Sequence, residues 1–316
     1  MSDKKRIDQP TGTETVGHEW DGIEELDTPM PRWWVISFWA CIVWAIGYVI
    51  LYPAIPMANS ATQGVLNWTS RGELDAEMKA ETLRRAPVTS ALASIPVEQL
   101  AGNERLYQAA VEGGRAAFKV HCVQCHGSGA AGSTGYPNLN DDDWLWGGDL
   151  NAIHVTLTHG IRQPDYDPTR FSQMPAFAGV LSTGEIDAVT SYVRSLSGLE
   201  KASAATAAGA TIFGNNCASC HGADGKGMRE FGAPNLTDGI WLYGGDKASL
   251  TTTVNQARYG VMPRWNNRLD PVTIKMLAAY VHSLGGGEEA PVAAPAPASV
   301  TAAAASPAKV AANAGN

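Results

Sequence analysis

The chain has 316 residues, of which 45% are hydrophobic and 17% charged, and its formal net charge is −8. This length allows about two ordinary domains, and five cysteines are too few for a disulfide scaffold. With 31 acidic against 23 basic residues there is no global positive field, so we expect no nucleic-acid partner. A mean hydropathy of −0.12 excludes a polytopic membrane protein.

An apolar run near the N-terminus predicts one transmembrane helix over residues 33–52. As a helix these residues span about 30 Å, which is the thickness of the hydrocarbon core of a bilayer. Tryptophan and tyrosine cluster at both ends of the run, as they do at membrane interfaces, and Pro31 and Pro53 bracket it. No small-residue cleavage site follows, so we expect an uncleaved anchor in contact with membrane lipid.

The orientation of this helix follows from the basic residues near its ends. Residues 1–32 contain Lys4, Lys5, Arg6 and Arg32, whereas residues 53–70 contain no lysine or arginine. The excess of positive charge predicts a cytoplasmic N-terminal segment over residues 1–32, with everything after the helix on the other side. Residues 53–104 read as a linker that is helical around Glu73 to Arg85. Cys41, within the apolar run, is expected to be a small packing residue.

The other four cysteines occur in two copies of the pattern C-x-x-C-H. The copies are Cys122-Val123-Gln124-Cys125-His126 and Cys217-Ala218-Ser219-Cys220-His221. This is the attachment signature of c-type haem: two thiols bind the two vinyl groups of a porphyrin and the histidine ligates the iron. A structural zinc site needs two cysteine pairs about 15–20 residues apart, but these lie 95 positions apart (217 − 122). A thioredoxin-like pair explains neither the histidine nor the duplication. We therefore expect two covalently bound haem c groups.

The duplication extends beyond the cysteine motifs. Pro137-Asn138-Leu139 recurs at Pro234, and residues 144–149 recur at 241–246, both at an offset of 97 positions (234 − 137). We therefore expect a mainly α fold with two similar domains, a first repeat over residues 105–199 and a second repeat over residues 204–286. The first repeat has extra residues between Ile161 and Met174. The Ala/Pro-rich segment 287–316 is expected to be a disordered tail.

Each repeat is expected to begin and end with a helix. Helical stretches over residues 103–119 and 204–213 precede the two cysteine motifs. A capping box at Ser182 opens the C-terminal helix of the first repeat, and Asp270-Pro271 opens that of the second. The glycine-glycine-aspartate turns that end at Asp149 and Asp246 are expected to cap further helices. A domain of about 90 residues buries little apolar surface alone, and a porphyrin would complete its core.

The sixth iron ligand decides between electron transfer and binding of a small molecule at an open iron position. Met174 and Met262 are each followed by proline and precede the C-terminal helix of their repeat, so we expect them to be the axial ligands opposite His126 and His221. We assume that each serves the haem of its own repeat, although the sequence does not exclude an exchange. The rival ligands are His154 and His159.

Other residues have weaker signals. Met228 is too close to its motif to ligate iron, and Met276 is expected to pack within a helix. Four aromatic residues are expected to line the haem pockets or to pack in the core: Trp144, Trp146, Trp241 and Tyr243. Arg162 and Arg170 either neutralise haem propionates, meet a partner or, as we expect, lie in a solvated loop. Three histidines have no repeated counterpart and are expected on the surface or in structural hydrogen bonds: His18, His121 and His282.

The whole pattern resembles the dihaem subunit of cbb3-type cytochrome c oxidases, the CcoP/FixP type. The resemblance covers about residues 15–285 and rests on the anchor, the two haem motifs with Met-Pro, and the segments His18-Glu19-Trp20-Asp21 and Pro31-Arg32-Trp33-Trp34. It implies two class I cytochrome c domains in the periplasm and an anchor in the bacterial inner membrane. It also assigns haem attachment and ligation to eight residues: Cys122, Cys125, His126, Met174, Cys217, Cys220, His221 and Met262.

The resemblance implies a respiratory role. Electrons from a donor cytochrome c would pass through this chain to an oxidase catalytic subunit with b-type haems and copper, beside a monohaem cytochrome c subunit, in a proton-pumping terminal oxidase. The chain would have no catalytic centre of its own. Two alternatives stay open from the sequence: a free-standing, membrane-anchored dihaem electron shuttle, and a dihaem peroxidase or gas sensor.

Overall fold

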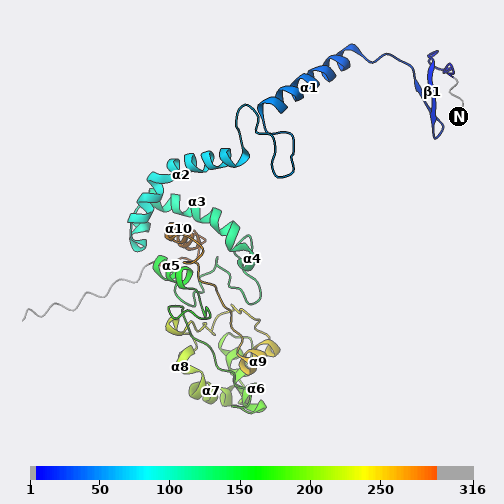
Figure 1. Ribbon diagram of the computed structural model, residues 1–316. Coiled ribbons are helices and arrows are strands. Elements are labelled where there is room, and N and C mark those ends of the chain that lie inside the picture. Colours follow the sequence, from blue (N-terminus) through cyan, green and yellow to red (C-terminus); the bar gives the residue numbers. More distant parts are fainter. Residues whose placement is uncertain (1–4, 290–316) are drawn as a thin grey trace, which may run out of the picture. The chain divides into compact units, whose positions relative to one another are not determined.

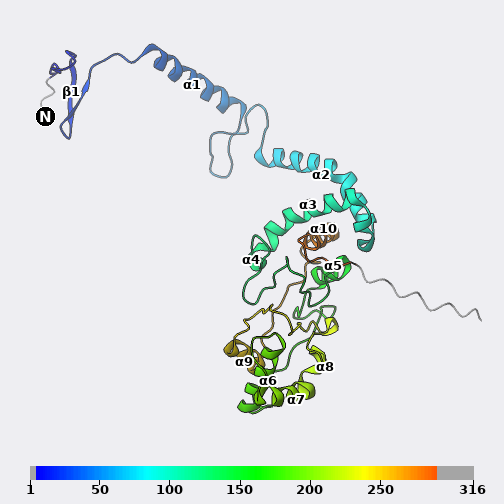
Figure 2. The same cartoon turned by 180° about the vertical axis from the view of Figure 1, so that it is seen from behind.

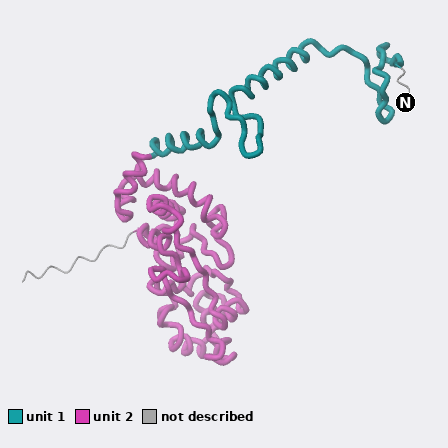
Figure 3. Tube along the Cα trace, viewed as in Figure 1, with its two compact units in different colours: residues 1–85 teal, residues 86–316 magenta. Residues whose placement is uncertain are grey.

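The computed structural model describes residues 5–289 and contains two compact units, Met1–Arg85 and Ala86–Asn316, which are coloured separately in Figure 3. Most of the predicted tail, from residue 290 onward, lies outside the described residues.

The first unit begins with a β-hairpin that the sequence analysis did not predict. Strand β1 (Thr15–Trp20) pairs antiparallel with β2 (Ile23–Leu26), and Trp20 lies opposite Ile23. Asp21 and Gly22 form the turn, with φ angles of 48° and 85°. Two residues with left-handed backbone angles give a turn whose twist matches that of the paired strands. An Asp-Gly dipeptide is therefore a sequence signal for a two-residue β-hairpin.

Helix α1 (Arg32–Leu51) agrees with the predicted membrane span to within one residue at each end. Pro31 precedes its first turn, and none of its side chains is buried. Within residues 5–289 it is the one helix that is long and apolar enough to cross a membrane. The prediction of one N-terminal candidate transmembrane helix is therefore confirmed.

Helix α2 (Ser70–Ser94) contains the helix expected around Glu73 to Arg85 and continues past Pro87. A short 3-10 helix, η1 (Val97–Gly102), follows it. Leu92 and Leu100 are fully buried, in a cluster that also contains Ala110 of the next helix. The segment before the first cysteine motif is therefore part of the core of the second unit.

The second unit is helical, which confirms the mainly α fold (Figure 1). Its remaining elements are α3 (Glu104–His121), α4 (Val123–His126), α5 (Leu150–His159), α6 (Thr183–Leu196), α7 (Ala204–Asn216), α8 (Ala218–His221), η2 (Arg229–Phe231), α9 (Lys247–Gln256) and α10 (Pro271–His282).

The predicted caps fix where these helices begin. Ser182 and Glu185 form the capping box of α6, and Asp270 accepts hydrogen bonds from the first turn of α10. Asp149 caps α5 through the backbone N–H groups of residues 151 and 152, and Asp246 caps α9. Each cap satisfies backbone donors that a helix leaves unpaired at its first turn.

The terminal helices of the two repeats are exchanged. Helix α10 packs against α3, whereas α6 packs against α7, and α3 and α10 lie side by side in both Figures 1 and 2. Gly114 and Gly209 occupy equivalent positions at the two crossings. An added Cβ would overlap the Met276 carbonyl oxygen at Gly114 and the Ala188 carbonyl oxygen at Gly209, so both crossings need glycine.

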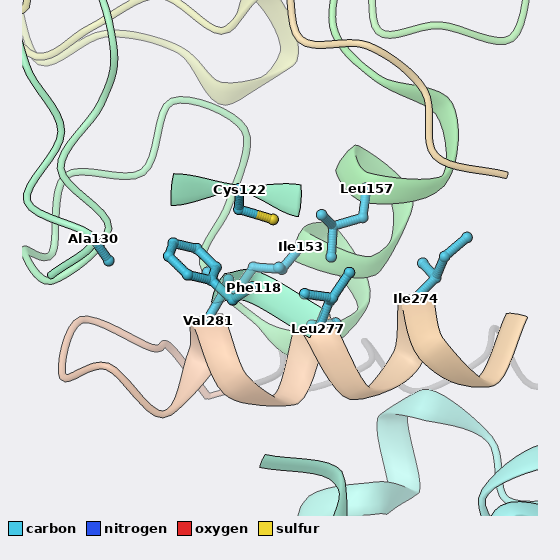
Figure 4. Packing of buried hydrophobic residues seen from close by; sticks show 9 residues of the cluster. Phe118, Cys122, Ala130, Ile153, Leu157, Ile274, Leu277 and Val281 are labelled. Carbon is cyan, nitrogen blue, oxygen red and sulfur yellow. The ribbon is translucent and has the colours of Figure 1, made fainter. Parts of the chain in front are cut away.

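Two hydrophobic clusters follow this exchange. In the first, Phe118 of α3, Ile153 of α5 and Leu277 of α10 pack together around Cys122 (Figure 4). The second joins α6 to elements of the second repeat and comprises Val189, Val193, Phe213, Leu236 and Leu250. Each cluster therefore combines residues of both repeats and lies beside one cysteine motif.

Candidate haem-binding sites

The second cysteine motif faces a cavity of about 460 Å³, which we call the second site. Cys217, Cys220 and His221 line it together with Met174. This volume lies within the range of ordinary ligand pockets. Its walls are mostly apolar and come from both repeats, and include Phe177, Val193, Phe213, Leu250 and Val254.

The first cysteine motif faces a smaller cavity of about 110 Å³, which we call the first site. Cys122 and His126 line it together with Met262, whereas Cys125 is exposed and is not among the wall residues. This volume is below that of an ordinary ligand pocket. For the first site the set of donor atoms, rather than the volume, indicates a haem.

Both motif histidines are oriented by the backbone. The Nδ1 atom of His126 lies 3.2 Å from the Pro137 carbonyl oxygen, and that of His221 lies 3.2 Å from the Pro234 carbonyl oxygen. Because a carbonyl oxygen only accepts, Nδ1 carries the proton and Nε2 keeps its lone pair. Burial lowers the pKa of both histidines, which favours the neutral imidazole that a metal binds.

The first cysteine of each motif, buried in one case and half-buried in the other, is held as a thiol. Burial, with a smaller contribution from the neighbouring cysteine, raises the pKa of Cys122 and of Cys217 to about 11. All four motif cysteines are free in the structure, with no disulfide between them. They are therefore available for thioether bonds to a porphyrin.

Each methionine lies beside the cysteine motif of the other repeat, and not beside the motif of its own repeat. Met174 of the first repeat lines the cavity of His221, and Met262 of the second repeat lines the cavity of His126. The physical reason is the exchange of helices, because each methionine segment leads into a C-terminal helix that packs on the other repeat. The structure thus places each methionine beside the motif histidine of the other repeat, which favours the exchange that the sequence left open.

The rival ligands lie elsewhere. Neither His154 nor His159 lines either cavity, and the Nδ1 atom of His159 is 2.9 Å from the Tyr166 hydroxyl oxygen. Met276 packs in the cluster of α3 and η1, as expected. His282 makes two structural hydrogen bonds, to the Tyr107 hydroxyl and to the Glu288 carbonyl oxygen.

The aromatic residues predicted to line the pockets do so. Trp144 and Trp146 border the first site, and Trp241 and Tyr243 border the second. The buried Nε1 of Trp241 and the buried Oγ1 of Thr190 have no hydrogen-bond partner in the described structure. Both residues line the second site, where the carboxylates of a haem would accept such donors. The residues present therefore fit a haem.

Arg162 and Arg170 are not in a solvated loop, contrary to our expectation. Both are half-buried, and burial lowers the pKa of each. Arg162 lines the second site. Arg170 donates to the Trp146 carbonyl oxygen at 2.7 Å, and its guanidinium carbon lies 5.5 Å from the centre of the Trp146 ring.

Sequence reasoning missed the role of the repeated prolines. Pro137 and Pro234 supply the carbonyl oxygens that orient the two histidines. The repeated Pro-Asn-Leu triplet was visible, and its recurrence shortly after each motif, 11 positions after His126 and 13 positions after His221, is the signal that could have identified it. The segment after the first proline also separates the sites, because four of its residues line both cavities: Pro137, Asn138, Asp143 and Leu145.

Two copies of a helical unit that bring C-x-x-C-H cysteines, an oriented histidine and a methionine to one cavity define a c-type cytochrome. A model of the family "Cytochrome C oxidase, cbb3-type, subunit III" matches residues 109–193 and 204–281, and a model of the "N-terminal domain of cytochrome oxidase-cbb3, FixP" matches residues 12–59. The double match confirms two cytochrome c domains and implies haem c.

Curated relatives are similar over nearly the whole chain. The cbb3-type cytochrome c oxidase subunit CcoP of Cereibacter sphaeroides is 52% identical over 290 residues, which cover 91% of this chain and 100% of the relative. The corresponding FixP subunit of Rhizobium meliloti is 50% identical over 289 residues, with the same coverage. The chain belongs to the CcoP/FixP family of cbb3-type cytochrome c oxidase subunits, which confirms the resemblance found in the sequence.

Proposed function

We propose that this chain carries two haem c groups and passes electrons from a donor cytochrome c to the catalytic subunit of a cbb3-type oxidase. The observation that carries the proposal is the set of donor residues that both cavities repeat. Each cavity is lined by at least one motif cysteine, by a histidine whose Nδ1 is hydrogen-bonded to a backbone carbonyl oxygen, and by a methionine. The names of the relatives, both oxidase subunits, support the complex.

We assign the following residues to the two haems. In the first site Cys122 and Cys125 attach the haem, and His126 and Met262 are its axial ligands. In the second site the corresponding residues are Cys217, Cys220, His221 and Met174. When bound, each haem supplies one-electron chemistry between ferric and ferrous iron.

The protein's own groups tune this chemistry. The proline carbonyls hold each imidazole in one tautomer and make it a stronger ligand, because the N–H that faces them is polarised. A thioether opposite histidine stabilises ferrous iron and raises the reduction potential. Apolar walls keep water away from the cavity, and the wall that both sites share favours electron transfer between them.

A filled sixth position leaves no vacant place for oxygen, so we propose that the chain has no catalytic centre and that oxygen is reduced in a partner. The partners in this proposal are a catalytic subunit with b-type haems and copper, a monohaem cytochrome c subunit and a soluble or membrane-bound donor. A peroxidase or gas sensor would need an open or readily displaced ligand.

For the location, we propose a single-pass protein of the bacterial inner membrane with a cytoplasmic N-terminus and periplasmic haem domains. The support is the candidate span α1 and the basic residues before it. A c-type haem domain attached to such an anchor would meet a donor cytochrome on the periplasmic side.

Purification of the tagged chain in mild detergent tests the complex, with untagged cells as control. We expect copper- and haem-b-containing subunits to accompany it, with two haems c on each copy of this chain. A chain that runs alone would support a free-standing shuttle instead. Stoichiometric binding of carbon monoxide by the reduced chain would favour the peroxidase or sensor.

A further inference from the structure

Arg162 bonds to both methionine-bearing segments at once. Its Nε donates to the Ser172 carbonyl oxygen at 2.6 Å, and its Nη1 donates to the Gly260 carbonyl oxygen at 3.0 Å. Ser172 lies two positions before Met174, and Gly260 lies two positions before Met262. One side chain therefore ties together the approaches to two ligands that belong to different sites.

Backbone hydrogen bonds next to Arg162 also connect this segment to Met262, which lines the first site. The N–H of Ile161 donates to the Met262 carbonyl oxygen at 2.9 Å, and the N–H of Met262 donates back at 3.0 Å. Gly160 has a φ of +70°, and a Cβ there would clash with the backbone of residues 262–264. The extra segment of the first repeat thus holds the methionine of the second repeat.

Backbone hydrogen bonds also hold the segment that leads to Met174, which lines the second site. The backbone N–H of Arg162 donates to the Arg170 carbonyl oxygen at 2.9 Å, and Arg170 donates to the Gly160 carbonyl oxygen at 3.2 Å. These bonds fold residues 160–172 into a compact loop whose end leads into Met174. Arg162 lies at its start, with an uncommon left-handed φ of 54°.

The guanidinium of Arg162 is suited to holding two carbonyl oxygens at once. No carboxylate partner of Arg162 is found among residues 5–289, where Tyr243 and Tyr259 are the groups that act on its charge, and its guanidinium carbon lies 5.7 Å from the centre of the Tyr259 ring. Half-burying a charge has a cost unless its donors are used. The planar fork of arginine reaches two acceptors in fixed directions, which the point charge of lysine does not.

We propose that Arg162 is a positioning residue that holds both axial methionines and thereby couples the two haem sites. The proposal rests on the proposed function, in particular on ligation by Met174 and Met262. If Arg162 is lost, both methionine segments lose a common anchor, so both irons should lose part of their methionine ligation together.

The test uses the full-length haem-loaded chain in detergent and the variants Arg162→Gln and Arg162→Lys. The readouts are the weak far-red ferric absorption band of a methionine–iron bond and the number of carbon monoxide molecules bound per reduced chain. Met174→Leu and Met262→Leu calibrate the band, because each should remove half of its amplitude. Wild-type protein without this band would refute methionine ligation itself, before Arg162 is considered.

We expect Arg162→Gln to remove more than half of the band and to allow carbon monoxide binding at both haems. Arg162→Lys keeps the charge but not the fork, so it should weaken both sites to a smaller degree. Haem content and circular dichroism show whether the Gln variant folds. If it does not fold, Arg162→Lys alone tests the positioning role of Arg162.

Arg194→Gln is the matched control. Arg194 is also half-buried and donates to two carbonyl oxygens, those of Gly245 at 2.6 Å and Leu199 at 3.2 Å, but it touches neither methionine segment. It should leave the band unchanged. An unchanged band in both Arg162 variants would overturn the proposal. A loss confined to the second site would also overturn it, and would indicate that Arg162 pairs with a haem carboxylate in that cavity.

Discussion

Replacement of Met262 by leucine tests which iron this methionine ligates. Met262 packs against the cluster that contains Cys122 and lines the cavity of His126, although 136 positions (262 − 126) separate it from that histidine. Leucine has a similar volume, and such apolar exchanges usually cost below about 1.5 kcal/mol. The fold should therefore survive, and spectral changes should report ligation alone.

The expected loss of the methionine–iron absorption band follows from the number of methionine–iron bonds in the chain. If the chain holds two methionine–iron bonds, Met262→Leu removes one, so the methionine band falls to about half and one carbon monoxide binds per reduced chain. A background with Cys217→Ala and Cys220→Ala keeps only the haem of the first motif. There Met262→Leu should abolish the band, whereas Met174→Leu should leave it.

The reciprocal background, Cys122→Ala with Cys125→Ala, should reverse these effects, and haem content with circular dichroism checks that each variant is folded. Loss of the band through Met174→Leu in the chain that keeps Cys122 and Cys125 would refute the exchange. Each methionine would then serve its own repeat.

Three further predictions concern stability and pH. Asp149→Ala removes the cap of α5 and should cost about 1 kcal/mol of unfolding free energy, measured in urea; an unchanged midpoint would contradict the capping role. Gly209→Ala should cost about 1–3 kcal/mol or more because its Cβ overlaps α6, whereas Gly214→Ala in the same helix meets nothing and should be tolerated; equal thermal midpoints would contradict the close crossing. Burial first, and nearby aspartates second, raise the pKa of Asp143 to about 6. Because a carboxylate stabilises ferric iron, the haem potentials in redox titrations should fall as pH rises through about 6, and Asp143→Asn should remove this dependence; an identical pH profile in that variant would exclude Asp143 as its source.

Local features were predictable from the sequence because their causes are local. The capping box at Ser182, the Asp270-Pro271 start of α10 and the apolar run of α1 each depend on neighbours within a few residues. The same holds for the two haem motifs, whose spacing carries their chemistry. The β-hairpin was missed although its Asp21-Gly22 turn is a recognised short-range signal.

The exchange of helices was not predictable from the apolar faces. Helices α6 and α10 carry the same spacing of apolar residues, so either one fits either N-terminal helix. The decisive feature is the connection: only residues 197–203 separate α6 from α7, and a short connection favours antiparallel neighbours. With α7 taken by α6, the partner left for α3 is α10.

The role of Arg162 was hidden for a related reason. The carbonyl oxygens that it contacts belong to residues 172 and 260, and their nearness depends on the whole fold. In sequence the segment reads as polar and loop-like, which favours exposure. Only the packed structure shows that its charge is half-buried and that its donors are used.

The central claim is that electrons pass through this chain to a partner that reduces oxygen. It is tested most directly by mixing the reduced protein with oxygen and following haem c absorbance, once for the isolated chain and once for the purified complex. We predict fast oxidation of both haems in the complex and slow oxidation in the isolated chain. Equally fast oxidation of the isolated chain, or haems c that stay reduced in a complex that consumes oxygen, would contradict the account.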